Sequence, residues 1–430
     1  MTPRPPCAEE LWLPDRGPGP RRQLERIYAA ALQAVDGRAA VRRALVTGDM
    51  AGPWWVIAVG KAAAAMTLGA LDCLGSRCLG GLAIEKTLPP DLRPFVAHGV
   101  DCRIGGHPLP TGASLAAGEH LLAALARTPP GARLLFLISG GASSLVEVPV
   151  AGLGLAQLER LNRWLLASGL PIGPMNRVRT AVSRIKGGGL LAALPPTPRR
   201  VLAISDVPAD DPGLIGSGLL VPASTAALAV ALAGLDLPPW LRTWVELGLA
   251  QRAAAPRPGP PIELVATLGL AKSAAAAAAR AAGLPAMVHP ALLDGDAAQR
   301  GGELARQVCD GVPGVQVWGG ETTVRLPPAP GRGGRNQHLA LAAALELAGH
   351  DDCWLLAAGT DGSDGPGEDA GALVDGWTLA RAARAGLTGA DCLARADSGR
   401  LLAASADLIA TGPTGTNVMD LVLGLKMPRL

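Results

Sequence analysis

Residues 134–144, LLFLISGGASS, carry the pattern that decides the fold. A short apolar run is followed at once by a turn of serine and glycine, as at a buried strand whose end faces a ligand. Five more apolar runs alternate with helical patterns, at residues 54–59, 201–204, 263–267, 315–318 and 354–358. This alternation predicts an α/β protein with largely parallel sheets covered by helices on both faces.

The length of 430 residues exceeds what one hydrophobic core usually supports, so we expect two domains with the active site in a cleft between them. Proline and alanine without periodicity in QRAAAPRPGPP, residues 251–261, indicate a connection. The expected division is a frayed leader at residues 1–22, an N-terminal domain at 23–255 and a C-terminal domain at 256–430.

Composition argues against several classes of partner. The 39 Lys and Arg against 36 Asp and Glu give a net charge of +3, and aromatic residues are 3%, which speaks against nucleic-acid binding. Residues 212–235 carry no charge, but glycines and a proline interrupt them, so we expect no membrane span. The leader has no apolar run for secretion, so we expect a cytoplasmic protein.

The seven cysteines are an odd number, scattered along the chain without a Cys-x-x-Cys pair. We expect reduced thiols with structural roles.

The turns that follow the first apolar runs are the first candidate sites. Gly60 and Lys61 lie between a strand and an Ala-rich helix, where backbone N–H groups, helix dipole and ammonium favour an anion. The alternative is a solvated lysine at a helix start. The second turn, which predicts a phosphate or carboxylate site or else a purely structural turn, contains Ser139, Gly140, Gly141 and Ser143. Neither turn matches a Walker A loop or a Gly-x-Gly-x-x-Gly fingerprint.

Charged residues in the middle of the chain extend this prediction. Arg184 and Lys186 precede a glycine triplet, which favours delivery of one of them to an anionic ligand over a solvated helix face. Asp206 follows an apolar run and suits Mg²⁺ bound to phosphates, whereas Asp210 and Asp211 are also explained as turn or cap residues.

Four further segments supply candidates in the C-terminal half. They combine glycines with acidic, hydroxyl and basic side chains at the ends of apolar runs or at the starts of expected helices, and so predict phosphate, metal or substrate contacts. For the turn at residues 411–417, expected just before a helix, a cap provided by Thr416 or Asn417 is the alternative. The candidates are Glu321, Thr322, Arg335, Asn336, Asp361, Asp364, Thr414 and Asn417.

In this order, the motifs GKAA, HPLPTGAS, SGGASS, VRTAVSRIKGGGL, SDVPADDP, GGETTV, GRGGRNQ, GTDGSDGP and TGPTGTNV resemble the bacterial glycerate 2-kinase family over residues 58–425. The resemblance implies a Rossmann-like N-terminal domain, a MOFRL-type C-terminal domain, and transfer of phosphate from ATP to the 2-hydroxyl of D-glycerate. It also implies that Lys61 and Arg335 act directly on substrate or phosphate.

The resulting hypothesis is in-line attack by a glycerate hydroxyl on the γ-phosphoryl group, with Mg²⁺ or another divalent cation joining the phosphates to Asp206 or Asp361. Which aspartate acts as the base stays open. Whether the chain forms a homodimer also stays open. Two alternatives remain: an NAD(P)H-dependent hydroxypyruvate reductase, a label common among such chains, and a non-catalytic protein that binds small anions.

Overall fold

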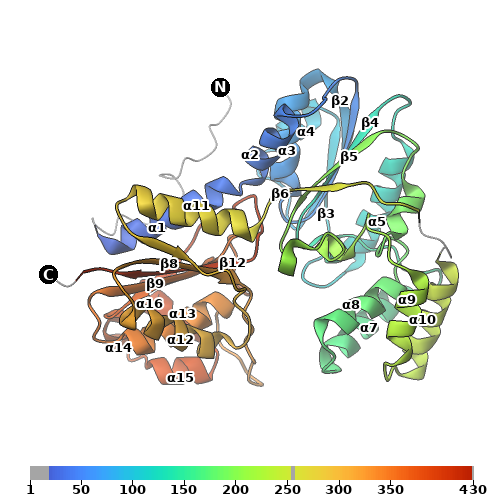
Figure 1. The fold of residues 1–430 in the computed structure, drawn as a ribbon. Coiled ribbons are helices and arrows are strands. Elements are labelled where there is room, and N and C mark those ends of the chain that lie inside the picture. Colours follow the sequence, from blue (N-terminus) through green and yellow to red (C-terminus); the bar gives the residue numbers. More distant parts are fainter. Residues whose placement is uncertain (1–18, 253–256, 429–430) are drawn as a thin grey trace. The chain divides into compact units, whose positions relative to one another are not determined.

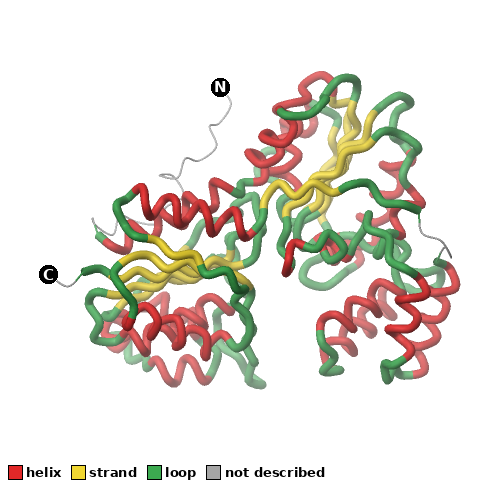
Figure 2. The backbone as a smooth tube through the Cα atoms, viewed as in Figure 1, coloured by secondary structure: helices red, strands yellow, loops and turns green. Residues whose placement is uncertain are grey.

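The computed structural model describes residues 19–252 and 257–428, which form two compact units, each built on a six-stranded sheet (Figure 1). Of the described residues, those between 37 and 265 form the parallel-sheet unit, and residues 19–36 together with 266–428 form the mixed-sheet unit. Helices cover both faces of each sheet (Figure 2). The predicted α/β class is therefore confirmed.

The parallel-sheet unit has strands in the order β3-β2-β1-β4-β5-β6, which is the order of doubly wound dinucleotide-binding sheets. All four strand pairs from β3 to β5 are parallel. The strands are β1 (Trp54–Val59), β2 (Cys78–Glu85), β3 (Val100–Ile104), β4 (Arg133–Ile138), β5 (Arg199–Ile204) and β6 (Ile262–Ala266). The strand order reverses between β1 and β4, and such a reversal is where open α/β sheets bind ligands.

Helices of this unit form two groups. One group comprises α2 (Gly37–Val46), α3 (Ala63–Leu74), α4 (Arg93–Ala97), α5 (Gly112–Ala126) and the short α6 (Ala142–Leu145). Within it, α5 and α6 pack with the sheet around the buried Ile57, Leu82, Leu121 and Phe136. The other group shares a separate apolar core and comprises α7 (Leu155–Ala167), α8 (Ile172–Ala181), α9 (Thr225–Ala233) and α10 (Pro239–Gln251).

The mixed-sheet unit has strands in the order β11-β10-β9-β12-β8-β7. They are β7 (Ala286–Val288), β8 (Gly314–Gly320), β9 (Cys353–Gly359), β10 (Gly371–Asp375), β11 (Leu408–Ile409) and β12 (Asp420–Lys426). Only β7 and β8 pair in parallel, and the other pairs are antiparallel. The prediction of a second largely parallel sheet is wrong, because the last strand inserts between β8 and β9 in the opposite direction.

Helices enclose this second sheet from both sides. One face is covered by α1 (Pro20–Ala34) and α11 (Leu268–Ala281), and the other by α12 (Ala297–Asp310) and α13 (Arg335–Leu347) (Figure 1). Further helices are α14 (Thr378–Ala383), α15 (Gly389–Ala394) and α16 (Ser398–Ala404). In the part of the chain that the structure describes, no helix is both long and apolar enough to span a membrane.

The two units do not follow the predicted domain limits. Of the predicted leader, residues 1–18 lie outside the described residues, and Pro20 already begins α1. Helix α1 packs on the mixed-sheet unit, although the prediction assigned it to the N-terminal domain. The predicted boundary between 255 and 256 also lies outside the described residues, and β6 beyond it joins the first sheet. Long-range packing explains both differences.

Candidate functional site

The predicted turns after β1 and β4 meet where the first sheet reverses its strand order. The Lys61 N–H donates to the Gly140 carbonyl at 2.9 Å, and the Ala62 N–H donates to Ser139 Oγ at 3.0 Å. Gly60 has a φ of +137°, and a Cβ there would lie 2.1 Å from Ser139 Oγ. Glycine is therefore required for the two turns to approach, and together they form one polar edge.

Gly141 and Ser143 continue this edge. Gly141 has a φ of +81°, and a Cβ on it would lie 3.0 Å from Lys61 Cγ, so the aliphatic stem of Lys61 lies across this glycine. The Ser143 hydroxyl lies 2.7 Å from that of Ser217. Lys61 and Gly141, which are 80 positions apart in the sequence, thus lie against each other, as the predicted anion site requires.

A cavity of about 220 Å³ opens beside these turns. Its size is below the roughly 300–1,000 Å³ typical of pockets for drug-sized ligands, so it suits a small metabolite. Polar groups dominate its wall: two cations, two carboxylates, three hydroxyls and two amides, namely Arg179, Lys186, Glu147, Asp206, Ser143, Ser144, Ser217, Asn162 and Asn176. The cavity therefore offers partners for both charged and hydroxyl groups of a ligand.

Lys186 lines this cavity but is already paired. Its ammonium forms an ion pair with Glu147, and both side chains are almost fully buried. The other oxygen of Glu147 accepts hydrogen bonds from Ser183 Oγ at 2.6 Å and the Val148 N–H at 3.0 Å. Since its charge is compensated within the chain, Lys186 is a weaker anion ligand than its position in the sequence indicates.

Arg179 is the other cation of the cavity. Its guanidinium donates to Asn162 Oδ1 at 3.1 Å and to Asn176 Oδ1 at 3.3 Å, both neutral acceptors. Burial lowers the pKa of Arg179, with Glu147 opposing part of this change. No carboxylate within the described residues forms a salt bridge with Arg179. Its charge is therefore more available to a ligand than the charge of Lys186, which is paired with Glu147.

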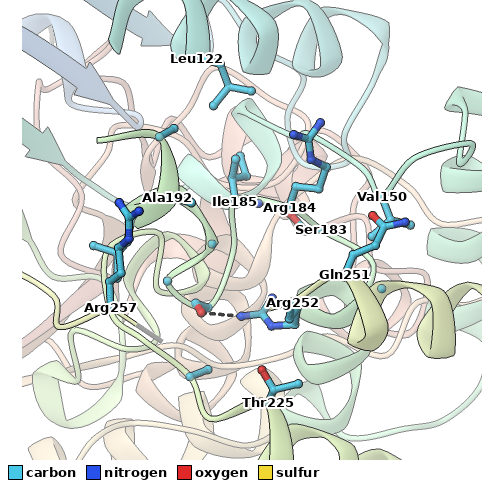
Figure 3. A pocket seen from close by; sticks show the side chains of 17 residues that line it. Leu122, Val150, Ser183, Arg184, Ile185, Ala192, Thr225, Gln251, Arg252 and Arg257 are labelled. Carbon is cyan, nitrogen blue, oxygen red and sulfur yellow. Dashed lines mark hydrogen bonds between the residues drawn. The ribbon is translucent and has the colours of Figure 1, made fainter. Parts of the chain in front are cut away.

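Arg184 lies elsewhere than predicted. Helix α8 ends at Ala181, so Arg184 is not on a helical face, and it lines a different, larger cavity of about 460 Å³ together with Arg252 and Arg257 (Figure 3). There Arg252 donates to backbone carbonyls of Thr180 and Lys186. Arg184 and Lys186, two residues apart, therefore face separate cavities.

The mixed-sheet unit gathers its predicted motifs at one edge because β12 runs against its neighbours. Asp420, the first residue of β12, pairs with Gly320 at the end of β8 and with Gly359 at the end of β9. The start of this antiparallel strand therefore lies between the carboxyl ends of two others. The prediction that a helix follows the 411–417 turn is wrong, because β12 follows it.

Arg335 is the central cation of this edge. It begins α13, and its guanidinium donates to both oxygens of Asp420, at 2.5 and 3.0 Å, and to Glu321 at 2.9 Å. Burial alone would lower the pKa of Arg335, but Asp420 and Glu321 raise it above its ordinary value. The side chain remains 37% exposed, so a ligand can still reach the guanidinium.

Asp364 and Asn336 serve the start of the same helix. The Asp364 carboxylate accepts hydrogen bonds from the backbone N–H groups of Asn336 at 3.0 Å and Gln337 at 2.8 Å. Burial raises the pKa of Asp364 to about 7, although these hydrogen bonds favour its charged form. The two side chains are nearly fully buried, which gives them a role in positioning Arg335.

The remaining predicted residues line the neighbouring loops. Asp361 accepts from the backbone N–H and the hydroxyl of Ser363, at 2.9 and 3.0 Å, and Thr414 donates its hydroxyl to the Thr360 carbonyl at 2.6 Å. The side chains of Thr322, which follows β8, and of Asn417, which precedes β12, are buried. The loops after β9 and before β12 are thus tied together by hydrogen bonds.

Sequence reasoning missed several residues on which these edges depend. Asp420 and Glu147 each stand alone in an apolar run, MDLVL and LVEVP, and a lone carboxylate in such a run is the signal of a buried pair. Tyr28 had no such signal: from α1 it donates its hydroxyl to the Gly359 carbonyl at 2.7 Å. Burial, with Asp361, Asp420 and Asp364 nearby, raises the pKa of Tyr28 well above its ordinary value.

Comparison with known proteins places this geometry in a family. Residues 23–237 match a domain of unknown function, DUF4147, and residues 314–420 match the MOFRL family. The chain is 32% identical to the D-glycerate 2-kinase of Thermotoga maritima, over 86% of this chain and 90% of that protein. The chain belongs to the glycerate kinase family with DUF4147 and MOFRL domains.

A solved structure shares this fold, and a further relative carries a different name. The crystal structure of the Thermotoga maritima glycerate kinase matches with a TM-score of 0.81 at 30% identity, over 95% of this chain and 99% of that one. A protein of Agrobacterium vitis named "Putative hydroxypyruvate reductase" is 36% identical over 93% of both chains. The resemblance seen in the ordered motifs is therefore confirmed.

Proposed function

We propose that the protein transfers phosphate from ATP to the 2-hydroxyl of D-glycerate, giving 2-phosphoglycerate and ADP. Its similarity to a D-glycerate 2-kinase over most of both chains supports this reaction. The observation that carries the proposal is the 220 Å³ polar cavity beside the β1 and β4 turns, where cations and hydroxyls surround a volume suited to a three-carbon hydroxy acid.

Within this cavity, Arg179 binds the glycerate carboxylate. Its guanidinium presents a planar pair of donors that matches a carboxylate, and its contacts inside the chain are with neutral amides. Lys186 and Glu147 form a rigid, neutral part of the wall, since they compensate each other. Asp206, on the same wall, is the candidate acceptor for the hydroxyl proton.

Lys61 and Arg335 bind the phosphate groups. Lys61 extends over Gly141 at the reversal point of the first sheet, beside two turns with backbone donors. Arg335 starts α13, held in one orientation by Asp420 and Glu321. Cations fixed in advance stabilise the charge that develops on transferring oxygens without reorganisation during the reaction.

A divalent cation that accompanies the nucleotide would be held by single carboxylates, together with the substrate phosphates. Among the described residues, no three carboxylates bring ligand atoms within 4.8 Å of one another, so the chain offers no cage made of carboxylates alone. Mg²⁺ usually binds through one or two carboxylates together with substrate phosphates and water. Asp206 and Asp361 each supply one such carboxylate, and the ion would neutralise charge on the phosphates of the nucleotide.

A coupled assay tests the reaction. Glycerate and Mg-ATP are supplied, and 2-phosphoglycerate is detected through enolase and pyruvate kinase with no phosphoglycerate mutase present. We expect a signal without mutase. A signal that requires mutase would contradict transfer to the 2-hydroxyl, and no signal with or without mutase would refute the kinase proposal.

Arg179→Lys, with Arg177→Lys as its control on the same helix, tests the cavity. Arg179 is half-buried in the cavity wall and Arg177 is exposed. Lysine keeps the charge but cannot bind a carboxylate through two parallel hydrogen bonds. We expect a KM for glycerate about tenfold higher for Arg179→Lys, since one charge-assisted hydrogen bond contributes about 1.5–3 kcal/mol, and no change for the control. Equal KM values would place glycerate elsewhere.

The name of the Agrobacterium relative favours a second candidate, reduction of hydroxypyruvate. The strand order of the first sheet suits dinucleotides, but its first turn reads Gly60-Lys61-Ala62-Ala63-Ala64 and lacks the glycines that admit a pyrophosphate. Oxidation of NADH or NADPH with hydroxypyruvate, alongside a silent kinase assay, would favour the reductase. Silence in both assays would favour a binding protein.

A further inference from the structure

Three soft metal ligands meet in the mixed-sheet unit, away from the edge that holds Arg335. They are the thiols of Cys309 and Cys353 and the imidazole of His350, whose ligand atoms all lie within 4.8 Å of one another. Cys309 is the penultimate residue of α12, Cys353 begins β9, and His350 lies in the loop before it. The sequence pattern favoured isolated structural thiols here, because residues 309 and 353 are far apart along the chain.

The backbone around these ligands is held in place. The Lys426 ammonium donates to the Cys309 and Gly311 carbonyls, and Lys426 is also the ladder partner of Cys353. The His350 N–H donates to the Leu347 carbonyl at 2.8 Å. A Cβ on Gly376 would lie 2.3 Å from the His350 carbonyl oxygen, so that loop is closely packed. The backbone that carries the three ligands is therefore fixed before any ion binds.

This cluster is separate from the proposed reaction. It lies at the amino end of β9, whereas Gly359 and Asp361 lie at the carboxyl end of the same strand. At about 3.3 Å per residue, the seven residues of the strand put about 20 Å between the two ends. A ligand bound at the cysteines would not touch the residues proposed for catalysis.

We propose that Cys309, His350 and Cys353 form a zinc site that joins the end of α12 to the start of β9. Zinc prefers thiolate and imidazole in a tetrahedron, with Zn–S near 2.3 Å and Zn–N near 2.0 Å, so neighbouring ligand atoms are about 3.4–3.8 Å apart. The 4.8 Å limit of the cluster accommodates this with small side-chain rotations. Water completes the fourth position.

Charges near the cluster favour a cation. The carboxylates of Asp352 and Asp310 lie close enough to act on Cys309, against one ammonium, Lys426, which is engaged with carbonyl groups. Asp352 is buried, and its carboxylate lies 3.5 Å from the Cys353 sulfur. Both cysteines are free thiols in the structure, as metal binding requires. Zinc here fixes two elements that the chain brings together only by folding.

Metal content and cobalt substitution test the proposal on the full-length protein, with any affinity tag removed so that it supplies no histidines. After exposure to zinc and removal of excess ion, we expect one zinc per chain by mass spectrometry of the metal. With Co²⁺ instead, we expect the intense thiolate-to-cobalt absorption of a tetrahedral site with two sulfur ligands. Absence of both signals overturns the proposal.

Variants separate this site from the other cysteines. Cys309→Ser and His350→Gln should each weaken zinc binding by about 100-fold or more, since the loss of even an outer partner costs about 10–100-fold. Cys392→Ser, at a buried thiol on α15, should bind like the wild type. Circular dichroism verifies that each variant is folded. Equal binding in all variants, or an isolated protein with a Cys309–Cys353 disulfide that takes up no cobalt, would contradict the zinc site.

Discussion

The two sheet edges hold their cations in opposite ways. In the parallel-sheet unit, Lys186 is 1% exposed and neutralised by the equally buried Glu147. In the mixed-sheet unit, Arg335 is 37% exposed and lies between Asp420 and Glu321. A buried, compensated pair gives a wall its shape, whereas a half-exposed arginine held by carboxylates can act on a ligand. The comparison teaches that a cation in a glycine-rich motif is not by itself an anion site.

The largest effect should come from the helix that the chain's beginning contributes to the mixed-sheet unit. Leu24 and Ile27 of α1 are 0% and 2% exposed, and each truncation to alanine should cost about 2–5 kcal/mol. For Leu24→Ala/Ile27→Ala we expect faster hydrogen exchange in β9, β12 and α11, with β1 and β4 unchanged, measured by mass spectrometry.

Leu121→Ala/Leu125→Ala on α5 is the matched control. These side chains are also fully buried, but in the core of the parallel-sheet unit. Exchange should then rise in β1 and β4 and stay slow in β9 and β12. If both double variants loosened the same strands, the division of the chain into these two units would be incorrect.

The membership of α1 shows the limit of sequence reasoning about this fold. All six predicted apolar runs overlap strands, because a short run of β-branched and aliphatic residues identifies a buried strand from local pattern alone. The pairing of those strands is a long-range property. Neither the insertion of β12 between β8 and β9 nor the packing of α1 on the second sheet has a local signal.

The candidate site shows the same limit at the level of side chains. Motif order identified the Gly60-Lys61 turn, the Ser139 turn and the Arg335 segment, which lie at the strand-end edges. It did not identify Glu147 or Asp420, the carboxylates that decide how Lys186 and Arg335 are used. Composition shows that a cation is present, but only the fold shows whether a carboxylate neutralises it.

Breaking the buried pair should have the next largest effect. Lys186→Met leaves Glu147 charged and buried, and loss of one partner of a buried pair costs about 3–5 kcal/mol. We expect this loss in the free energy of unfolding by urea. Adding Glu147→Gln, which keeps an acceptor for Ser183, should restore much of the stability.

An exposed pair calibrates that measurement. Arg306 and Glu346 also form an ion pair, but their side chains are 54% and 39% exposed. Arg306→Met should change stability by less than about 1 kcal/mol, because surface pairs contribute little. Similar losses for Lys186→Met and Arg306→Met would contradict the structural role assigned to the buried pair.

Arg335→Lys should act on turnover instead of stability. Lysine keeps the charge but cannot engage both oxygens of Asp420 and Glu321 together while facing a phosphate. Removal of one positioned donor typically costs about 100–1,000-fold in kcat, or about 2.7–4 kcal/mol. The mutase-free glycerate kinase assay measures this loss, and thermal unfolding verifies that the fold persists.

Arg332→Lys serves as the control for this substitution. Arg332 lies in the glycine-rich loop just before α13, is 56% exposed and pairs with Asp369 at 2.8 Å. Its kcat should stay within about twofold of the wild type, because this arginine acts at the surface. Equal losses for the two variants would mean that the loop, and not the held guanidinium of Arg335, supports turnover.

A smaller effect is the dependence of stability on pH. Each sheet edge holds one carboxyl group against the start of a helix, Asp364 at α13 and Glu85 at α3. Burial raises the pKa of Asp364 to about 7 and that of Glu85 to about 7, from ordinary values of 3.8 and 4.5. Between those values and 7 the folded state binds more protons than the unfolded state. Stability should therefore fall as pH rises from 5 to 7, by about 2 kcal/mol for each carboxyl.

Asp364→Asn and Glu85→Gln should each flatten the dependence of unfolding free energy on pH, while Asp351→Asn, at an exposed carboxylate, should not. The two amides should differ in a second respect. Both oxygens of Asp364 accept backbone N–H groups of α13, from Asn336 and Gln337, whereas Glu85 accepts one, from Ala64 of α3 at 2.9 Å. An amide keeps only one acceptor, so Asp364→Asn should lose about 0.5–2 kcal/mol more than Glu85→Gln at pH 8, where both carboxyls are ionised. Equal losses at pH 8 would contradict the greater dependence of the Arg335 helix on its buried carboxyl.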